Sequence, residues 1–120
     1  MQSILASTMT ATPLTDAEYQ RLTSAVLARI EAAVDAWLQA DVIDIDAQRT
    51  GGLLELALPN GSKIVVNTQP PLHELWLAAR AGGYHFQHVD GRWCDTRDGV
   101  EFFERLSQRA SEQSGRVLAF

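Results

Sequence analysis

Cysteine is almost absent from this 120-residue sequence, in which Cys94 is the only one. A single cysteine cannot form an intramolecular disulfide, and no Cys-x-x-Cys pair exists to bind a structural zinc ion or a cluster of the chain's own. This pattern fits a reducing compartment, and we expect the cytoplasm. Apolar runs are short and interrupted by charge, so no segment approaches the roughly 20 residues that a membrane helix needs.

Charge of either sign is lacking in the first thirteen residues. They have neither the basic start of a secretion signal nor the arginines of a mitochondrial presequence. We therefore predict a disordered leader over residues 1–13. Residues 14–120 are predicted to form one domain, because a chain of this length buries a single ordinary core.

An excess of positive charge is also lacking, since the net formal charge is −5. This balance argues against general nucleic-acid binding, in which basic side chains displace counterions from phosphates. The region from Thr15 to Asp46 holds seven acidic residues and two arginines, whereas the rest of the chain is neutral. We expect a one-sided negative field that attracts cations or a basic partner.

A helix is predicted to begin at Thr15, because Thr15 and Glu18 have the spacing of a capping box. Apolar residues then recur at steps of three and four from Tyr19 to Trp37, which indicates one buried face. The opposite face is polar. After the helix the period changes to two: in residues 42–46 the isoleucines point one way and the aspartates the other, which predicts a first edge strand.

A hairpin is predicted over residues 53–67, with its turn at residues 59–61. A two-residue turn would pair Leu56 with Val65, whereas a three-residue loop pairs Leu56 with Ile64 and keeps the apolar side chains on one face. We prefer the three-residue loop, which also places Gly61 at a left-handed position.

The remaining sequence predicts three more strands and a second helix. A strand over residues 73–79 turns Trp76 to the outer face, and we expect a turn at Gly82–Gly83 before a second hairpin over residues 84–96. A capping pattern at residues 98–101 opens a helix with Phe102 and Leu106 facing inward. Helix, antiparallel strands and helix together predict an α+β sandwich with both helices on one sheet face.

The segment from Asn60 to Phe86 resembles the central signature of the frataxin family in its bacterial form. The residues that occupy the spacing of the family's Asn-x-Gln-x-Pro…Trp-Leu pattern are Asn67, Gln69, Pro71, Trp76 and Leu77. The resemblance extends from about Leu14 to Phe120. It implies a frataxin-like two-layer sandwich with an antiparallel sheet of six to seven strands. It also implies iron binding through surface carboxylates, and docking on the cysteine desulfurase and the scaffold protein that build iron–sulfur clusters.

Five acidic residues are the candidate metal ligands: Glu31, Asp35, Asp41, Asp44 and Asp46. Glu31 and Asp35 lie one turn apart on the predicted helix, so both carboxylates can approach one cation, and oxygen ligands suit iron. Asp35 and Asp41 lie near the helix C-terminus, where the helix dipole disfavours negative charge by roughly 0.3–1 kcal/mol each. The alternative is a solvated polar face. Alanines beside Glu31 and Asp35, where bacterial relatives often pair carboxylates, indicate weak iron binding.

Asn67, Gln69 and Trp76 share the outer sheet face by parity and form the candidate partner-binding patch. The alternative is an ordinary, partly covered surface tryptophan. His85 and His88 are three residues apart on a strand, point to opposite faces and are not expected to share a metal ion.

Together these features predict a monomeric, non-enzymatic, iron-binding regulatory protein of iron–sulfur cluster assembly, with Fe²⁺ or Fe³⁺ bound weakly at the carboxylates. No catalytic arrangement of side chains is recognised in the sequence. The alternative function is an iron chaperone of the storage or ferroxidase type.

Overall fold

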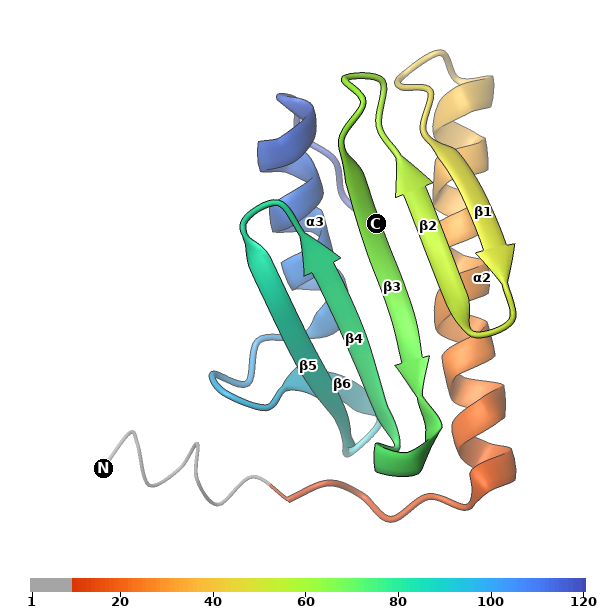
Figure 1. Ribbon diagram of the computed structural model, residues 1–120, viewed down its shortest axis with the longest axis vertical. Helices are drawn as coiled ribbons and strands as arrows, with labels where there is room; N and C mark the ends of the chain where they lie inside the picture. The colour runs from red at the N-terminus through yellow and green to blue at the C-terminus, as the bar shows by residue number, and fades with distance from the viewer. Residues whose placement is uncertain (1–9) are drawn as a thin grey trace.

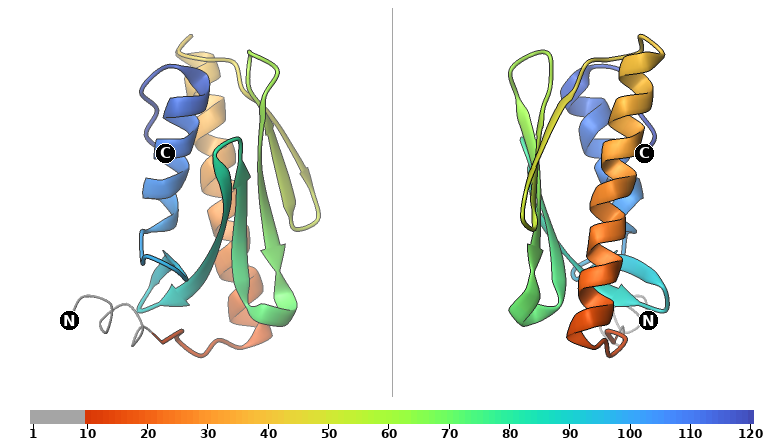
Figure 2. Two further views of the ribbon diagram at one scale, coloured as in Figure 1. Left: turned by 60° about the vertical axis from the view of Figure 1, so that its left-hand side comes forward. Right: turned by 90° about the vertical axis from the view of Figure 1, so that its right-hand side faces the viewer.

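Two helices pack on one face of a six-stranded antiparallel sheet in the computed structural model, which describes residues 10–120 (Figure 1). The elements are α2 (Asp16–Gln39), β1 (Asp46–Thr50), β2 (Leu53–Ala57), β3 (Lys63–Gln69), the 3-10 turn η1 (Pro70–Leu72), β4 (Glu74–Ala79), β5 (Gly82–Val89), β6 (Arg92–Asp95) and α3 (Phe102–Ser114). The strands lie in chain order. Both helices cover the same side of the sheet and leave the other side open (Figure 2). The predicted fold class is confirmed.

Residues 1–9 of the predicted leader lie outside the described residues. Thr12, in the remainder of that segment, contacts the β5–β6 hairpin: its N–H donates to the carbonyl of His88 (2.7 Å), and its hydroxyl accepts from the N–H of Asp90 (2.9 Å). Contacts with the sheet therefore begin before Leu14.

Helix α2 begins where the capping box predicts. The Thr15 hydroxyl accepts from the N–H of Glu18 (3.1 Å), and the Glu18 carboxylate accepts from the N–H of Thr15 (2.8 Å). The hydrogen bond from the Thr15 backbone N–H to the carboxylate is the main cause that lowers the pKa of Glu18. Tyr19, Val26 and Ile30 are buried against the sheet, as their spacing predicts.

The prediction of a first strand over residues 42–46 is wrong, because β1 spans Asp46–Thr50 and residues 42–45 are a connection. Ile45 is buried and Ile43 packs against the core. The alternation of isoleucine and aspartate therefore reflects a connection that packs on the core without pairing. Strand β1 is polar and forms the edge of the sheet. It pairs with β2 along its whole length, with Asp46 opposite Ala57 at one end and Thr50 opposite Leu53 at the other.

The β2–β3 hairpin has the predicted three-residue loop. Leu54 pairs with Val66 and Leu56 with Ile64, and all four side chains are buried. The N–H of Leu58 donates to the carbonyl of Ser62 (2.8 Å). Gly61 takes the left-handed conformation (φ +86°) that the loop requires.

The turn predicted at Gly82–Gly83 is wrong. Ala79 pairs with Gly82, so the two-residue loop between β4 and β5 is Arg80–Ala81 and the glycines begin β5. This difference shifts the register of β5 against β4, with consequences for the outer face of the sheet.

Helix α3 and the tail complete the core. Phe102, Leu106 and Ala110 are buried, and the Phe102 ring meets Phe86 edge to face (5.1 Å). Gly115 ends the helix in a left-handed conformation. In the tail Leu118 is buried. Neither helix within residues 10–120 is long and apolar enough to cross a membrane.

Candidate functional site

The acidic surface consists of Glu31, Asp35, Asp41, Asp44 and Asp46. The middle and end of α2 supply the first two, the connection to β1 supplies the next two, and Asp46 begins β1. The four aspartates are exposed and Glu31 is half-buried. All five side chains therefore belong to one end of α2 and the neighbouring sheet edge.

Glu31 is paired with an arginine. The Nη2 atom of Arg49, on β1, lies 2.7 Å from the Glu31 Oε1 atom. Arg49 follows Asp46 by three residues, just outside the acidic stretch defined from sequence. With this arginine included, residues 15–50 hold seven acids and three bases, a net charge of −4.

Two aspartates form hydrogen bonds at the C-terminal end of α2. Asp35 accepts a hydrogen bond from Gln39 Nε2 (3.1 Å) on the same helix. Asp41 follows the C-cap residue with φ +59°, and its N–H donates to the carbonyl of Leu38 (3.2 Å). Aspartate is one of the few residues that tolerates this left-handed conformation, so Asp41 also has a structural role.

Asp44 lies beside a different set of groups, in a cavity lined by the loop of the β2–β3 hairpin, by Ser114 at the end of α3 and by Arg116 after it. Within residues 10–120, no three His, Cys, Asp or Glu side chains gather closely enough to hold a metal ion. The acidic surface can attract cations through its field and offers exposed oxygen ligands. A closed coordination shell is not present in the described part of the chain.

The outer sheet face carries a row of neighbouring side chains on β3, β4 and β5. Asn67 pairs with Trp76, and Trp76 pairs with His85. The Trp76 and His85 rings are stacked, with centroids 4.0 Å apart and planes within 4°. Gln69 pairs with Glu74 at the end of the same two strands. The three predicted partner-binding residues are therefore brought together.

Glu74 fixes the orientation of the indole. The Trp76 Nε1–H donates to Glu74 Oε1 (2.8 Å), and the same oxygen lies 3.8 Å from His85 Nδ1. We call Glu74, Trp76 and His85 the aromatic platform. Each side chain is held by the other two, so the half-buried indole is presented in one orientation.

Parity along residues 73–79 puts Glu74 on the same face as Trp76, but sequence reasoning did not identify Glu74 or His85 as partners of the indole. A loop at Gly82–Gly83 would have set Trp76 opposite Val89, whereas the observed Arg80–Ala81 loop sets it opposite His85. Parity placed His85 and His88 on opposite faces correctly, and His88 is buried. The missing signal was the register of β5 against β4.

Tyr19 anchors the platform from the helix side of the sheet. Its hydroxyl donates to the carbonyl of Glu74 (2.5 Å) and accepts from the N–H of Gln69 (2.9 Å). Burial raises the pKa of Tyr19. The ring stacks on His73 (4.7 Å), whose Nε2 lies 2.8 Å from Asp16 Oδ1. These contacts join α2 to the chain segment that carries Gln69 and Glu74.

Comparison with known proteins identifies relatives over most of the chain. Residues 12–116 match the family model of the frataxin-like domain. An iron-sulfur cluster assembly protein CyaY from Burkholderia mallei (strain SAVP1) is 50% identical over 107 residues, which cover 89% of this chain and 98% of the relative. A protein of the same name from Cupriavidus taiwanensis is 50% identical over 108 residues, 90% of this chain and 97% of the relative.

Solved structures share the fold. A frataxin from Psychromonas ingrahamii superposes with a TM-score of 0.79 at 32% identity, over 88% of this chain and 97% of the other. A trimeric frataxin from Saccharomyces cerevisiae, complexed with ferrous iron, has a TM-score of 0.66 at 21% identity, over 97% and 99% of the two chains. At that identity the second likeness concerns the fold alone.

Proposed function

The chain belongs to the frataxin-like family, and on that premise we propose that it serves iron–sulfur cluster assembly as a non-enzymatic binding protein. The outer sheet face docks on the scaffold protein, and the acidic surface meets a basic surface of the cysteine desulfurase. The observation that carries this proposal is the aromatic platform on the open face of the sheet.

The platform has the physical character of a binding hot spot. Trp76 is held by a ring stack and a hydrogen bond, so little side-chain entropy remains to be lost when a partner covers it. Asn67 and Gln69 add amide groups that can donate and accept hydrogen bonds beside the indole. A rigid aromatic group ringed by polar groups is typical of residues that dominate interface energies.

Iron is proposed to bind weakly at the acidic surface, through Glu31, Asp35, Asp41, Asp44 and Asp46, and to modulate the contact with the desulfurase. The exposed carboxylates and the Glu31–Arg49 ion pair favour loose, salt-sensitive attraction over tight coordination. The yeast structural neighbour was solved in complex with ferrous iron, and we extend this property to the present chain only as part of the proposal.

Scaffold binding is tested by Trp76→Ala, with Val117→Ala as the control. Val117 is 92% exposed and follows α3, away from the outer face. We expect Trp76→Ala to weaken binding of the purified scaffold protein about thirtyfold in calorimetric titration, the effect of losing about 2 kcal/mol at a hot spot. Val117→Ala should bind as the wild type does. Unchanged affinity in a folded Trp76→Ala variant would reject docking through this face.

Desulfurase binding is tested by two charge reversals, Asp35→Lys on the acidic surface and Glu104→Lys on α3. Both residues are exposed and both variants change the net charge by the same amount. We expect only Asp35→Lys to weaken binding and to flatten its salt dependence. Equal losses in the two variants would show that net charge alone matters.

The alternative function, iron storage or ferroxidase activity, makes a different prediction. It requires iron-driven assembly, visible as increased light scattering during aerobic addition of ferrous iron, or oxidation faster than in a protein-free sample. We expect neither, because the described carboxylates form no cluster that could hold the metal for turnover.

A further inference from the structure

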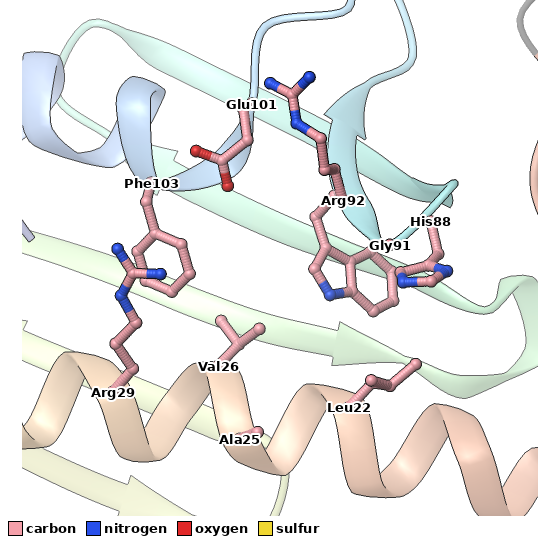
Figure 3. Close-up of a pocket in the computed structure, with 10 residues that line it drawn as sticks. Leu22, Ala25, Val26, Arg29, His88, Gly91, Arg92, Glu101 and Phe103 are labelled. Carbon is pink, nitrogen blue, oxygen red and sulfur yellow. The ribbon is translucent and has the colours of Figure 1, made fainter.

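A cavity of about 470 Å³ lies between α2, the β5–β6 turn and the start of α3 (Figure 3). Its volume is in the range of small-molecule sites. Trp93 and Phe103 contribute aromatic surface to the lining, and Arg29, Arg92, His88 and Glu101 contribute the polar groups. None of the residues of the acidic surface or the aromatic platform lines it.

The polar groups of this cavity are mainly hydrogen-bond donors without acceptors. Within residues 10–120, the Arg92 guanidinium forms no ion pair or hydrogen bond, and the Trp93 indole N–H has no acceptor. His88 is only 8% exposed, its Nδ1 atom is buried without a partner, and Nε2 makes no hydrogen bond in the same part of the chain. Buried polar groups are normally paired, so the unpartnered Nδ1 of His88 is the atom that calls for a ligand, and the exposed Arg92 guanidinium has no protein partner to compete with an anion.

Arg29 adds a second guanidinium that is already oriented. Its Nη2 atom donates to the carbonyl of Phe120 (3.1 Å), and the group lies 3.7 Å above the centre of the Phe103 ring. Figure 3 shows Arg29 rising from α2 beside Phe103, with the Arg92 side chain on the far side of Glu101. The remaining N–H groups of the Arg29 fork can still donate.

Glu101 is the one acidic side chain in the lining. Its carboxylate caps α3 by accepting from the N–H of Glu104 (3.1 Å), and it forms no ion pair with Arg29 or Arg92. Two arginines against one glutamate leave the lining with a net formal charge of +1, in a chain whose total is −5. The cavity is therefore a local site of opposite sign to the protein as a whole.

We propose that this cavity binds a small organic anion, with its carboxylate against Arg92 and Arg29 and its aromatic or aliphatic group on Trp93 and Phe103. Guanidinium groups recognise carboxylates with charge-assisted hydrogen bonds. The aromatic walls add affinity only for a ligand that carries apolar surface. The site is separate from the surfaces of the proposed function, so the proposal goes beyond it.

The test is an NMR titration of the ¹⁵N-labelled full chain, observed at its three indole N–H groups. Trp93 lines the cavity, whereas Trp37 and Trp76 do not and serve as internal controls. Three probes are compared. The first, 3-phenylpropanoate, carries both a carboxylate and a ring, whereas acetate carries the carboxylate alone and 3-phenylpropan-1-ol carries the ring alone. We expect 3-phenylpropanoate to shift the Trp93 signal saturably and more tightly than either other probe. A Trp93 signal that stays fixed up to about 10 mM 3-phenylpropanoate, or equal affinity for acetate, would overturn the proposal.

Two matched variants separate recognition from net charge. Arg92→Gln and Arg116→Gln each remove one exposed positive charge, but only Arg92 lines the cavity. We expect Arg92→Gln to weaken 3-phenylpropanoate binding about tenfold, the effect of losing one charge-assisted hydrogen bond. Arg116→Gln should leave affinity within about twofold. Equal losses in the two variants would contradict the assignment.

Discussion

Replacing Arg49 with glutamine should strengthen the binding of ferrous iron at the acidic surface. Arg49 holds the Glu31 carboxylate at 2.7 Å, so a cation must approach that carboxylate against a neighbouring positive charge. Glutamine removes the charge and keeps a polar side chain of similar reach. The two side chains are 30% and 37% exposed, so water still screens the pair and its loss should cost no more than about 1 kcal/mol of stability.

The size of the effect follows from the geometry. A divalent ion on Glu31 would lie about 5 Å from the guanidinium, where the repulsion in the dielectric of water is about 1.7 kcal/mol. Physiological salt, with a Debye length of about 8 Å, roughly halves it. Removing the remaining 0.8 kcal/mol or so should tighten binding about fourfold.

The assay is an anaerobic titration with ferrous iron, followed by the broadening of amide NMR signals around Glu31 and Asp35. The matched control is Arg80→Gln, which removes one exposed arginine from the β4–β5 loop and changes the net charge equally. We expect Arg49→Gln to bind more tightly than Arg80→Gln. Equal affinities would refute the reasoning, because the gain would then come from net charge and not from the freed carboxylate.

Further predictions concern stability. Tyr19→Phe should lower the free energy of unfolding by about 1–3 kcal/mol in urea titration. The substitution removes the hydroxyl that is the hydrogen-bond partner of the Glu74 carbonyl and the Gln69 N–H. Gly52→Ala should destabilise by about 1–3 kcal/mol, since a Cβ there overlaps the Thr68 hydroxyl, and Thr68→Ala in the same chain should restore much of the loss. Partial burial would raise the pKa of Asp98, but the hydrogen bond from Arg105 outweighs it and the net pKa is lowered. The stability from this pair is present above the ordinary aspartate pKa of 3.8 and is lost as pH falls through the lowered value. Asp98→Asn should therefore be less stable than the wild type near neutral pH by a few tenths of a kcal/mol, and this difference should disappear in acid denaturation once the pH has fallen through the lowered pKa of Asp98.

Local signals predicted much of the fold. The capping box at Thr15 set the start of α2, and the three-residue loop before Ser62 set the register of β2 against β3. Both depend on neighbouring residues, whose backbone geometry is fixed by short-range hydrogen bonds. The order of helices and strands then limited the architecture to two layers.

Features that depend on distant contacts were not predictable in the same way. Strand β1 holds Ala47, Gln48 and Arg49 without apolar alternation, and it is a strand because β2 offers it an edge. The Glu31–Arg49 ion pair depends on that pairing, so it was missed with the strand. The arginines of the cavity come from α2 and β6, which only the tertiary packing brings together.

The aromatic platform shows the same limit. Parity along β4 placed Trp76 on the outer face, but its contact with His85 required the β4–β5 register. A glycine pair is a common turn signal, and here the glycines began a strand instead. The residue types of β4 therefore indicated a contact surface, and the register of β5 against β4 determined which other side chains belong to it.

We propose that the outer sheet face docks on the scaffold protein. This proposal is tested most directly by NMR cross-saturation of the ²H,¹⁵N-labelled chain from unlabelled scaffold protein, which reports the residues in contact. We expect the Trp76 indole and the amides near Asn67 and His85 to lose intensity, while those of α3 do not. Saturation confined to the helix side, with Trp76 unaffected, would contradict it.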